Sequence, residues 1–321
     1  MAPRKSKEKA QVEEIPDLAT GLKKCKIIES DLQELEDMKM LQSRALILWC
    51  PAEGEDRPYE GTHETVLFCD FVERGLAVPV FDFLQALLRF WGIQLHHLTL
   101  QSILHLSIFT HMCEAFLGVL PHFHLFQYFF YLSPIPSTSM PTVIGGAELV
   151  LRPENESEYL FYQPSSKGVE WKSYWFYVGN FESPLPERTP GAPKAQASWM
   201  STNPGGSQVD KLRSVLAKLK NKGVTRGKVV YSFLGRQVRP LQRRIHPGFR
   251  YEGLEDPSRF SSEKINFADL FKRCCKVLDD FEKAPALPRL FSAANPPENA
   301  WVSTRLLYSS TFLFAFCGFL T

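Results

Sequence analysis

The segment from Val80 to Leu132 constrains the fold of this chain more strongly than any other. Its 53 residues include only three charged side chains, Asp82, Arg89 and Glu114, but nine Phe and six of the eight His. A segment with so few charges is too apolar to remain exposed to water. It therefore forms the core of a folded domain or a surface that binds something apolar.

Glycine and proline divide this apolar segment into several helices. The pattern predicts helices over Val80–Trp91, Leu100–Leu117 and Phe123–Leu132, each bounded by Gly or Pro. Thr99 can cap the second of them. None approaches the ~20 uninterrupted apolar residues that a bilayer-spanning helix needs. The segment is therefore expected to be a set of packed helices.

Three shorter elements are predicted ahead of this segment. Ser30 and Gln33 have the spacing of a capping box, which indicates a short helix. The apolar run Leu46–Trp49 is typical of a buried strand. Thr62 can cap a further helix that continues to Arg74.

Beyond a stretch rich in Pro, Ser and Thr, the pattern changes to aromatic residues with a period of two. The segments Glu148–Leu151, Tyr159–Tyr162 and Trp171–Val178 are predicted to be strands. Helices followed by a few short strands are typical of the α+β class. We therefore expect a mainly helical domain with a small aromatic-rich antiparallel β unit and a disordered N-terminal tail.

The composition divides the chain into nine parts, and the first is predicted to be disordered because it is poor in apolar residues. They are a basic and acidic tail (1–24), a short helix and strand (25–61), the helical core (62–132), a linker (133–144), a β-rich unit (145–182), a Pro/Gly-rich loop (183–206), a basic helical segment (207–260), an amphipathic helix and loop (261–305) and an apolar tail (306–321).

Charge is distributed very unevenly along the chain. The net charge is +2, but the stretch from Lys211 to Arg250 contains 12 Lys or Arg and no Asp or Glu, which leaves −10 for the remainder (2 − 12). An amphipathic helix capped by Ser207 is predicted to carry the first part of this basic segment, with Leu212 and Leu216 on its apolar side. The basic residues are Lys211, Arg213, Lys218, Lys220, Lys222, Arg226, Lys228, Arg236, Arg239, Arg243, Arg244 and Arg250.

Two interpretations of the basic segment remain open. Lys and Arg neutralise phosphate groups, and interleaved aromatic residues such as Tyr231 and Phe249 can stack on unpaired bases. The twelve basic residues would then bind RNA or DNA. Alternatively, they form a solvated helix face and tie the segment to the acidic remainder of the chain.

The sequence contains no convincing catalytic or metal-binding set. A transposase or integrase needs carboxylates that converge on divalent metal ions, yet Asp70, Asp82 and Glu114 lie in apolar stretches that are predicted to be helical. Pairs such as His111 and Cys113 do not have the spacing of a zinc site. No glycine-rich phosphate loop occurs. We therefore predict no catalytic residues, no metal site and no cofactor.

The cysteines and the chain ends bear on the location of the protein. Seven Cys without paired spacing, and the absence of an apolar leader, predict a reducing compartment, either the nucleus or the cytoplasm. The uncharged run from Leu306 to Thr321 is short for a membrane-spanning helix. A protein held at a membrane by this tail is kept as an alternative, although a membrane partner is not favoured.

Motifs from residue 64 onward resemble a known family. The runs Phe71–Pro79 (FVERGLAVP), Gly92–Leu98 (GIQLHHL) and Cys113–Gly118 (CEAFLG) occur in an order similar to that of the plant family labelled "putative gypsy-type transposon" or "putative transposase, gypsy type", which is abundant in grasses. Weaker similarity continues to Arg259. The resemblance therefore covers roughly residues 64 to 260, and it implies a retroelement-derived protein without established catalytic residues.

The leading hypothesis joins this resemblance to the charge pattern. We expect a retroelement-derived, non-enzymatic protein that acts by association, with RNA or DNA and other copies of itself as candidate partners. The first alternative is an active, metal-dependent transposase or integrase-like enzyme. The second is the membrane-associated protein.

Overall fold

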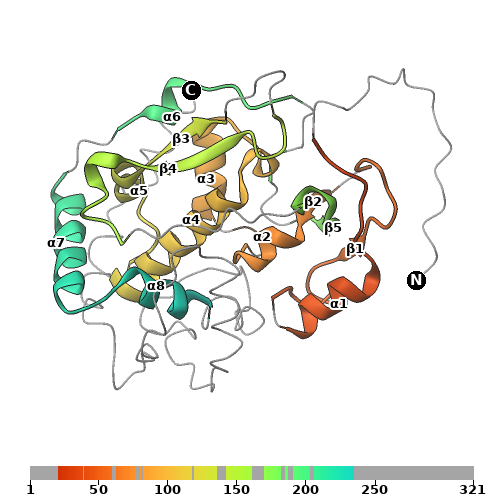
Figure 1. Cartoon of the computed structure of the whole chain (residues 1–321), viewed down its shortest axis with the longest axis horizontal. Helices are drawn as coiled ribbons and strands as arrows, with labels where there is room; N and C mark the ends of the chain where they lie inside the picture. The colour runs from red at the N-terminus through yellow and green to blue at the C-terminus, as the bar shows by residue number, and fades with distance from the viewer. Residues whose placement is uncertain are drawn as a thin grey trace.

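The computed structural model describes residues 21–234, except 39, 60–62, 77, 79, 81, 118, 136–141, 161–169, 182–184, 187–190 and 203–205. In this part of the chain, helices α1–α8 and strands β1–β5 build an α+β fold, which confirms the predicted class. Helix α4 runs through the middle, and the other helices and two small sheets lie around it (Figure 1).

Three helices form the centre of the core, namely α3 (Asp82–Trp91), α4 (Leu100–His111) and α5 (Phe123–Phe129). Eleven of the twelve residues of α4 are buried, so this helix is packed on all sides. The Thr99 hydroxyl accepts a hydrogen bond from the backbone N–H of Ser102 at 3.1 Å, which confirms the predicted cap. A π-helical turn, η3, follows α4 and covers the rest of the predicted second helix.

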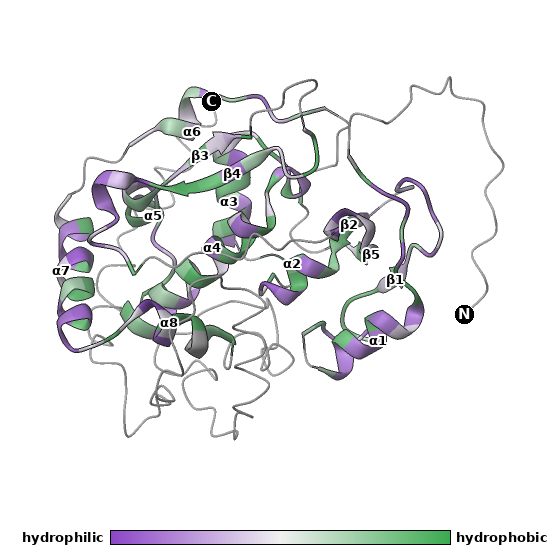
Figure 2. Cartoon of the chain, viewed as in Figure 1, coloured by the Kyte–Doolittle hydropathy of each residue, from purple (hydrophilic) through white to green (hydrophobic). Residues whose placement is uncertain are grey.

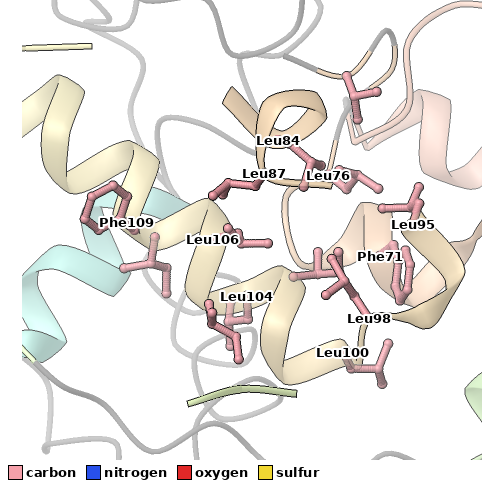
Figure 3. Packing of buried hydrophobic residues seen from close by; sticks show 14 of the residues in the cluster. Phe71, Leu76, Leu84, Leu87, Leu95, Leu98, Leu100, Leu104, Leu106 and Phe109 are labelled. Atoms are coloured by element: carbon pink, nitrogen blue, oxygen red, sulfur yellow. The ribbon is translucent and has the colours of Figure 1, made fainter. Parts of the chain in front are cut away.

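Phenylalanine side chains fill the space between these helices. The ring of Phe126 lies 5.1 Å, centroid to centroid, from Phe109 and also 5.1 Å from Phe130. Leu87 of α3 and Leu106 of α4 point toward one another in the same core (Figure 3). The apolar segment is therefore the interior of the domain rather than a binding surface.

A three-stranded antiparallel sheet connects distant parts of the chain. It contains β1 (Trp49–Pro51), β5 (Trp175–Gly179) and β2 (Glu64–Phe68), in the order β1-β5-β2. Trp49 lies opposite Val178, and Phe68 lies opposite Trp175. The central strand therefore comes from a later part of the sequence than both of its neighbours.

Two predictions near this sheet are wrong. The expected helix from Thr62 to Arg74 is instead strand β2 followed by the short helix α2 (Cys69–Glu73). Its β-branched and aromatic side chains suit a strand, and pairing with β5 decides between the two conformations. The expected strand Leu46–Trp49 begins only at its last residue, because a turn occupies the residues before it.

A second sheet of two antiparallel strands, β3 (Phe130–Pro134) and β4 (Ala147–Leu151), packs on α4. The Ser102 hydroxyl accepts a hydrogen bond from the Leu149 N–H at 2.8 Å and so joins β4 to α4. β4 confirms the strand predicted there. The predicted helix Phe123–Leu132 is wrong for its last three residues, because they pair with β4 as part of β3.

The remaining predicted strands are only partly present. Tyr159 and Leu160 are not in a strand, and the residues that follow them lie outside the described part. Trp171–Ser173 forms a 3-10 turn, and the predicted third strand begins only at Trp175. β4 and β5 lie in different sheets, and each pairs with strands from earlier in the chain.

The N-terminal helix α1 (Glu29–Asp37) confirms the helix predicted near Ser30, but its cap is different. Ile28 is the N-cap residue, and its backbone N–H donates to the carboxylate of Asp31 at 3.0 Å. An acidic side chain in the first turn also interacts favourably with the helix dipole.

Three helices complete the described chain, namely α6 (Ala197–Met200), α7 (Ser207–Asn221) and α8 (Arg226–Phe233). The indole N–H of Trp199 in α6 donates to the carbonyl oxygen of Trp91 at 2.8 Å. This bond fixes α6 against the end of α3.

Several predictions lie outside the described residues. They concern the first 20 residues of the N-terminal tail, the amphipathic helix and loop (261–305) and the apolar tail (306–321). In the part of the chain that the structure describes, no helix combines the length and the apolar character needed to cross a membrane.

Candidate nucleic-acid interface

Helix α7 carries the first half of the basic segment, and its apolar stripe fixes its orientation. Leu212, Val215, Leu216 and Leu219 are buried at the predicted positions i, i+3, i+4 and i+7. Green and purple residues alternate around this helix in Figure 2, as expected for a helix with one buried side. Gly206, rather than Ser207, is the N-cap residue.

Arg213 is held by contacts within the protein. Its guanidinium group donates to both carboxylate oxygens of Glu158, each at 2.7 Å, and to Asp210 at 2.9 Å. It also lies 4.4 Å from the ring centroid of Tyr128. These hydrogen bonds lower the pKa of Glu158 and raise the pKa of Arg213. Arg213 therefore ties α7 to the rest of the core, as the structural interpretation expects.

Two further lysines bond to backbone carbonyl groups. Lys220 donates to the carbonyl oxygen of Ser157, and Lys228 donates to that of Gly223 at 2.8 Å. An ammonium group has three donors, so one such bond leaves others for a second acceptor. These two lysines are fixed near the end of α7 but remain chemically able to contact phosphate.

Three lysines share the outward side of α7, and we call Lys211, Lys218 and Lys222 the lysine face. All three are exposed. Spacings of seven and four residues place them within one narrow strip along the helix, roughly 10 and 6 Å apart in rise. The described chain thus presents three exposed lysines in a row on this side of α7.

Helix α8 anchors the next part of the basic segment to the core. Its residues Val229, Val230 and Phe233 are buried, and the helix packs against α4. Gly75 has a φ of +90°, and a Cβ there would overlap the Phe233 ring, so only glycine suits this contact. Arg226, at the start of α8, is half-buried. α8 is therefore fixed to the core through its apolar side chains.

The remaining candidate residues lie outside the described part of the chain. They are Arg236, Arg239, Arg243, Arg244 and Arg250.

The carboxylates considered for a transposase are dispersed. Asp70 in α2 pairs with Arg74 at 2.8 Å, Asp82 is exposed at the start of α3, and Glu114 is buried in η3. Within the described residues, no group of three or more His, Cys, Asp and Glu side chains could hold a metal ion.

Two histidines of the apolar segment, His97 and His122, serve as polar links in the core. The His122 Nδ1 accepts a hydrogen bond from the Leu125 N–H at 3.1 Å and caps α5, while its Nε2 faces Gln208 of α7 at 3.4 Å. His97 has the same kind of arrangement, with its Nδ1 on the Gln94 N–H. Burial lowers the pKa of both imidazoles to about 4. Both rings are therefore neutral near pH 7.

Sequence reasoning did not identify the partners of Arg213. Glu158 lies in a turn after β4, and Tyr128 lies in α5, so only the fold brings them to α7. The sequence offered one signal for this pairing. Three acidic residues, Glu154, Glu156 and Glu158, occur close together ahead of the basic segment and are candidate ion-pair partners for it.

The fold and this surface define an α+β protein with an apolar helical core and a lysine-bearing outer helix. Residues 66–134 match the family described as "putative gypsy type transposon". This segment is therefore similar to that gypsy-type transposon family, in agreement with the resemblance. No curated protein and no solved structure matches the chain.

The matched segment coincides with the core elements rather than with the charged surface. It begins within β2, ends with β3, and includes α2, α3, α4 and α5. The basic segment from Lys211 onward lies beyond it. The similarity expected beyond residue 134, and the plant origin, stay predictions.

Proposed function

We propose that this gypsy-type transposon-related protein acts by association and binds RNA or DNA through its basic segment, Lys211 to Arg250. The observation that carries the proposal is the lysine face, a row of exposed cations within a segment of 12 basic and no acidic residues. The family match supports an origin in elements that handle nucleic acid, but it assigns no partner.

The described contacts favour binding to the phosphate backbone rather than to base edges. Lysine ammonium groups act as mobile point charges, whereas reading of bases requires planar or fixed donors. Arg213, the described arginine best suited to bidentate contacts, is occupied by Glu158. Binding should therefore depend on charge and salt, with little sequence preference.

Charge reversal tests the proposal. One variant replaces the lysine face (K211E/K218E/K222E), and a second replaces three arginines beyond α8 (R239E/R243E/R244E). Each variant should bind a fluorescent 20-nucleotide RNA or DNA about 10-fold more weakly or worse, as measured by anisotropy. The reason is that each lost phosphate contact reduces the number of counterions that binding releases.

The matched control is K24E/K194E, which reverses two exposed lysines outside the basic segment. It should bind within about two-fold of the unaltered protein. Unchanged binding by both basic-segment variants, with circular dichroism showing intact folding, contradicts the proposal.

A further inference from the structure

The segment that holds α1 has an excess of acidic residues. From Glu29 to Asp56 the sequence has eight Asp or Glu and two Lys or Arg, a net charge of −6 (2 − 8). Some of these carboxylates are used internally, since Glu29 pairs with Arg44 and Asp31 caps the helix. Glu34 and Asp37, one helical turn apart, are exposed on the outward side of α1. We call these two residues the acidic face.

Apolar side chains lie close to the acidic face in sequence and structure. Of the nine exposed large hydrophobic residues in the described chain, four fall between Ile28 and Leu48, and they are Ile28, Met38, Leu46 and Leu48. Leu46 and Leu48 are 58% and 54% exposed. Because α1 packs on β1, which starts directly after Leu48, these side chains border the helix. An apolar surface with a charged rim is typical of a protein contact.

The segment that holds α7 and α8 has the complementary charge. From Ser207 to Leu234 the sequence has seven Lys or Arg and one Asp, a net charge of +6 (7 − 1). Leu120, which is 41% exposed, lies in the connection between η3 and α5, the two elements that contact α7.

These two ends cannot meet within one molecule. α7 and α1 lie on opposite sides of the core, with α4 and α2 between them (Figure 1). We propose that the acidic face of one copy binds the lysine face of a second copy, head to tail. Such a contact joins two different surfaces, so each added copy leaves one surface of each kind open, and the assembly is a chain or a ring.

Each ion pair in this contact is exposed to solvent and contributes little alone. The contact therefore depends on several pairs acting together with the apolar side chains, and it should weaken strongly with salt. Nucleic acid and the acidic face would compete for the lysine face. The self-contact itself does not require nucleic acid, so it can be measured without it.

Sedimentation of the nuclease-treated full chain tests this inference. At 50 mM NaCl, we expect the mean mass of the unaltered protein to rise with concentration, and at 500 mM NaCl the association constant should fall at least about 10-fold. E34K/D37K and K211E/K218E should each remain monomeric at 50 mM NaCl. Combining all four changes in one chain restores opposite charges at the two ends and should restore association.

Mixing experiments add a second criterion. E34K/D37K is positive at both faces, and K211E/K218E is negative at both faces, so an equimolar mixture should associate into alternating hetero-oligomers. A monomeric wild-type protein at 50 mM NaCl, or association of E34K/D37K as strong as that of the unaltered protein, overturns the inference. E34K/D37K should retain nucleic-acid binding, so the failure of one proposal does not imply failure of the other.

Discussion

Helices α4 and α7 have similar lengths, but the fold uses their sequences in different ways. α4 buries eleven of its twelve residues, whereas α7 buries five of fifteen and keeps its lysines outside. Packing accounts for nearly every side chain of α4, and the family match covers that helix. Packing accounts for only one side of α7.

The difference separates residues that build the fold from residues that remain for a partner. In α7, Arg213 belongs to the first group because Glu158 and Tyr128 fix it. Lys211 and Lys218 belong to the second group, since their replacement should leave the core intact. Three measurements test whether the two groups of residues differ in this way.

The largest expected effect is the loss of stability in mild acid. Burial lowers the pKa of His97 and His122 to about 4, and that of His105 to about 3, whereas an unfolded histidine titrates near 6.5. The unfolded chain therefore binds more protons between these values, and stability falls as the pH falls from about 6.5 toward 4. Between pH 7 and 5, each of the three should cost about 2 kcal/mol, measured by urea denaturation.

His105→Leu provides the matched variant, because it removes one buried imidazole from α4. Unfolding of this variant should take up about one proton fewer between pH 6 and 5, so its unfolding free energy should depend less steeply on pH. Ile108→Val, at a buried position of the same helix without a titratable group, is the control and should leave the slope unchanged. A slope that is the same in all three proteins would contradict the assignment of neutral imidazoles to the core.

The second effect concerns the aromatic core itself. Phe109→Ala removes a fully buried ring that contacts Phe83, Phe126 and Phe130, so it should destabilise the protein by about 3–5 kcal/mol. Lys218→Ala in α7 should change the unfolding free energy by less than about 0.5 kcal/mol. Comparable losses in both variants, in the same denaturation experiment, would remove the distinction between the two helices.

The smallest effect is the coupling between Arg213 and Glu158. Their side chains are 30% and 37% exposed, so solvent screens the pair despite its two short hydrogen bonds. A double-mutant cycle with Arg213→Ala and Glu158→Ala should give a coupling of about 0.5–1 kcal/mol that decreases in 1 M NaCl. If the coupling were not measurable, Glu158 would not hold Arg213, and Arg213 would be available for a partner.

Local sequence patterns predict the helices well because their signals are local. The Thr99 cap and the apolar runs identify α3 and α4, and the spacing of Leu212 to Leu219 identifies the buried side of α7. β2 is missed because its strand conformation depends on β5, which lies far along the chain. The same reason applies to α5, where the last predicted turn pairs with β4 instead.

The sequence predicts which segment of the candidate interface is basic, but it does not predict which of the basic side chains lie on the surface. Twelve basic residues in one segment are evident from the sequence, but their individual roles are not. Arg213 differs from Lys211 only because the turn after β4 brings Glu158 to its guanidinium group. Long-range placement of a single carboxylate has no local signal in the sequence.

The salt dependence of nucleic-acid binding is the direct test of whether the lysine face contacts phosphate groups. With the full chain and a 20-nucleotide single strand, a plot of log K against log salt concentration should be linear, with a slope of about −3 or steeper, and K211E/K218E/K222E should reduce the slope by about 2. A slope near zero, or one that the three changes leave unaltered, would show that these cations do not meet phosphate.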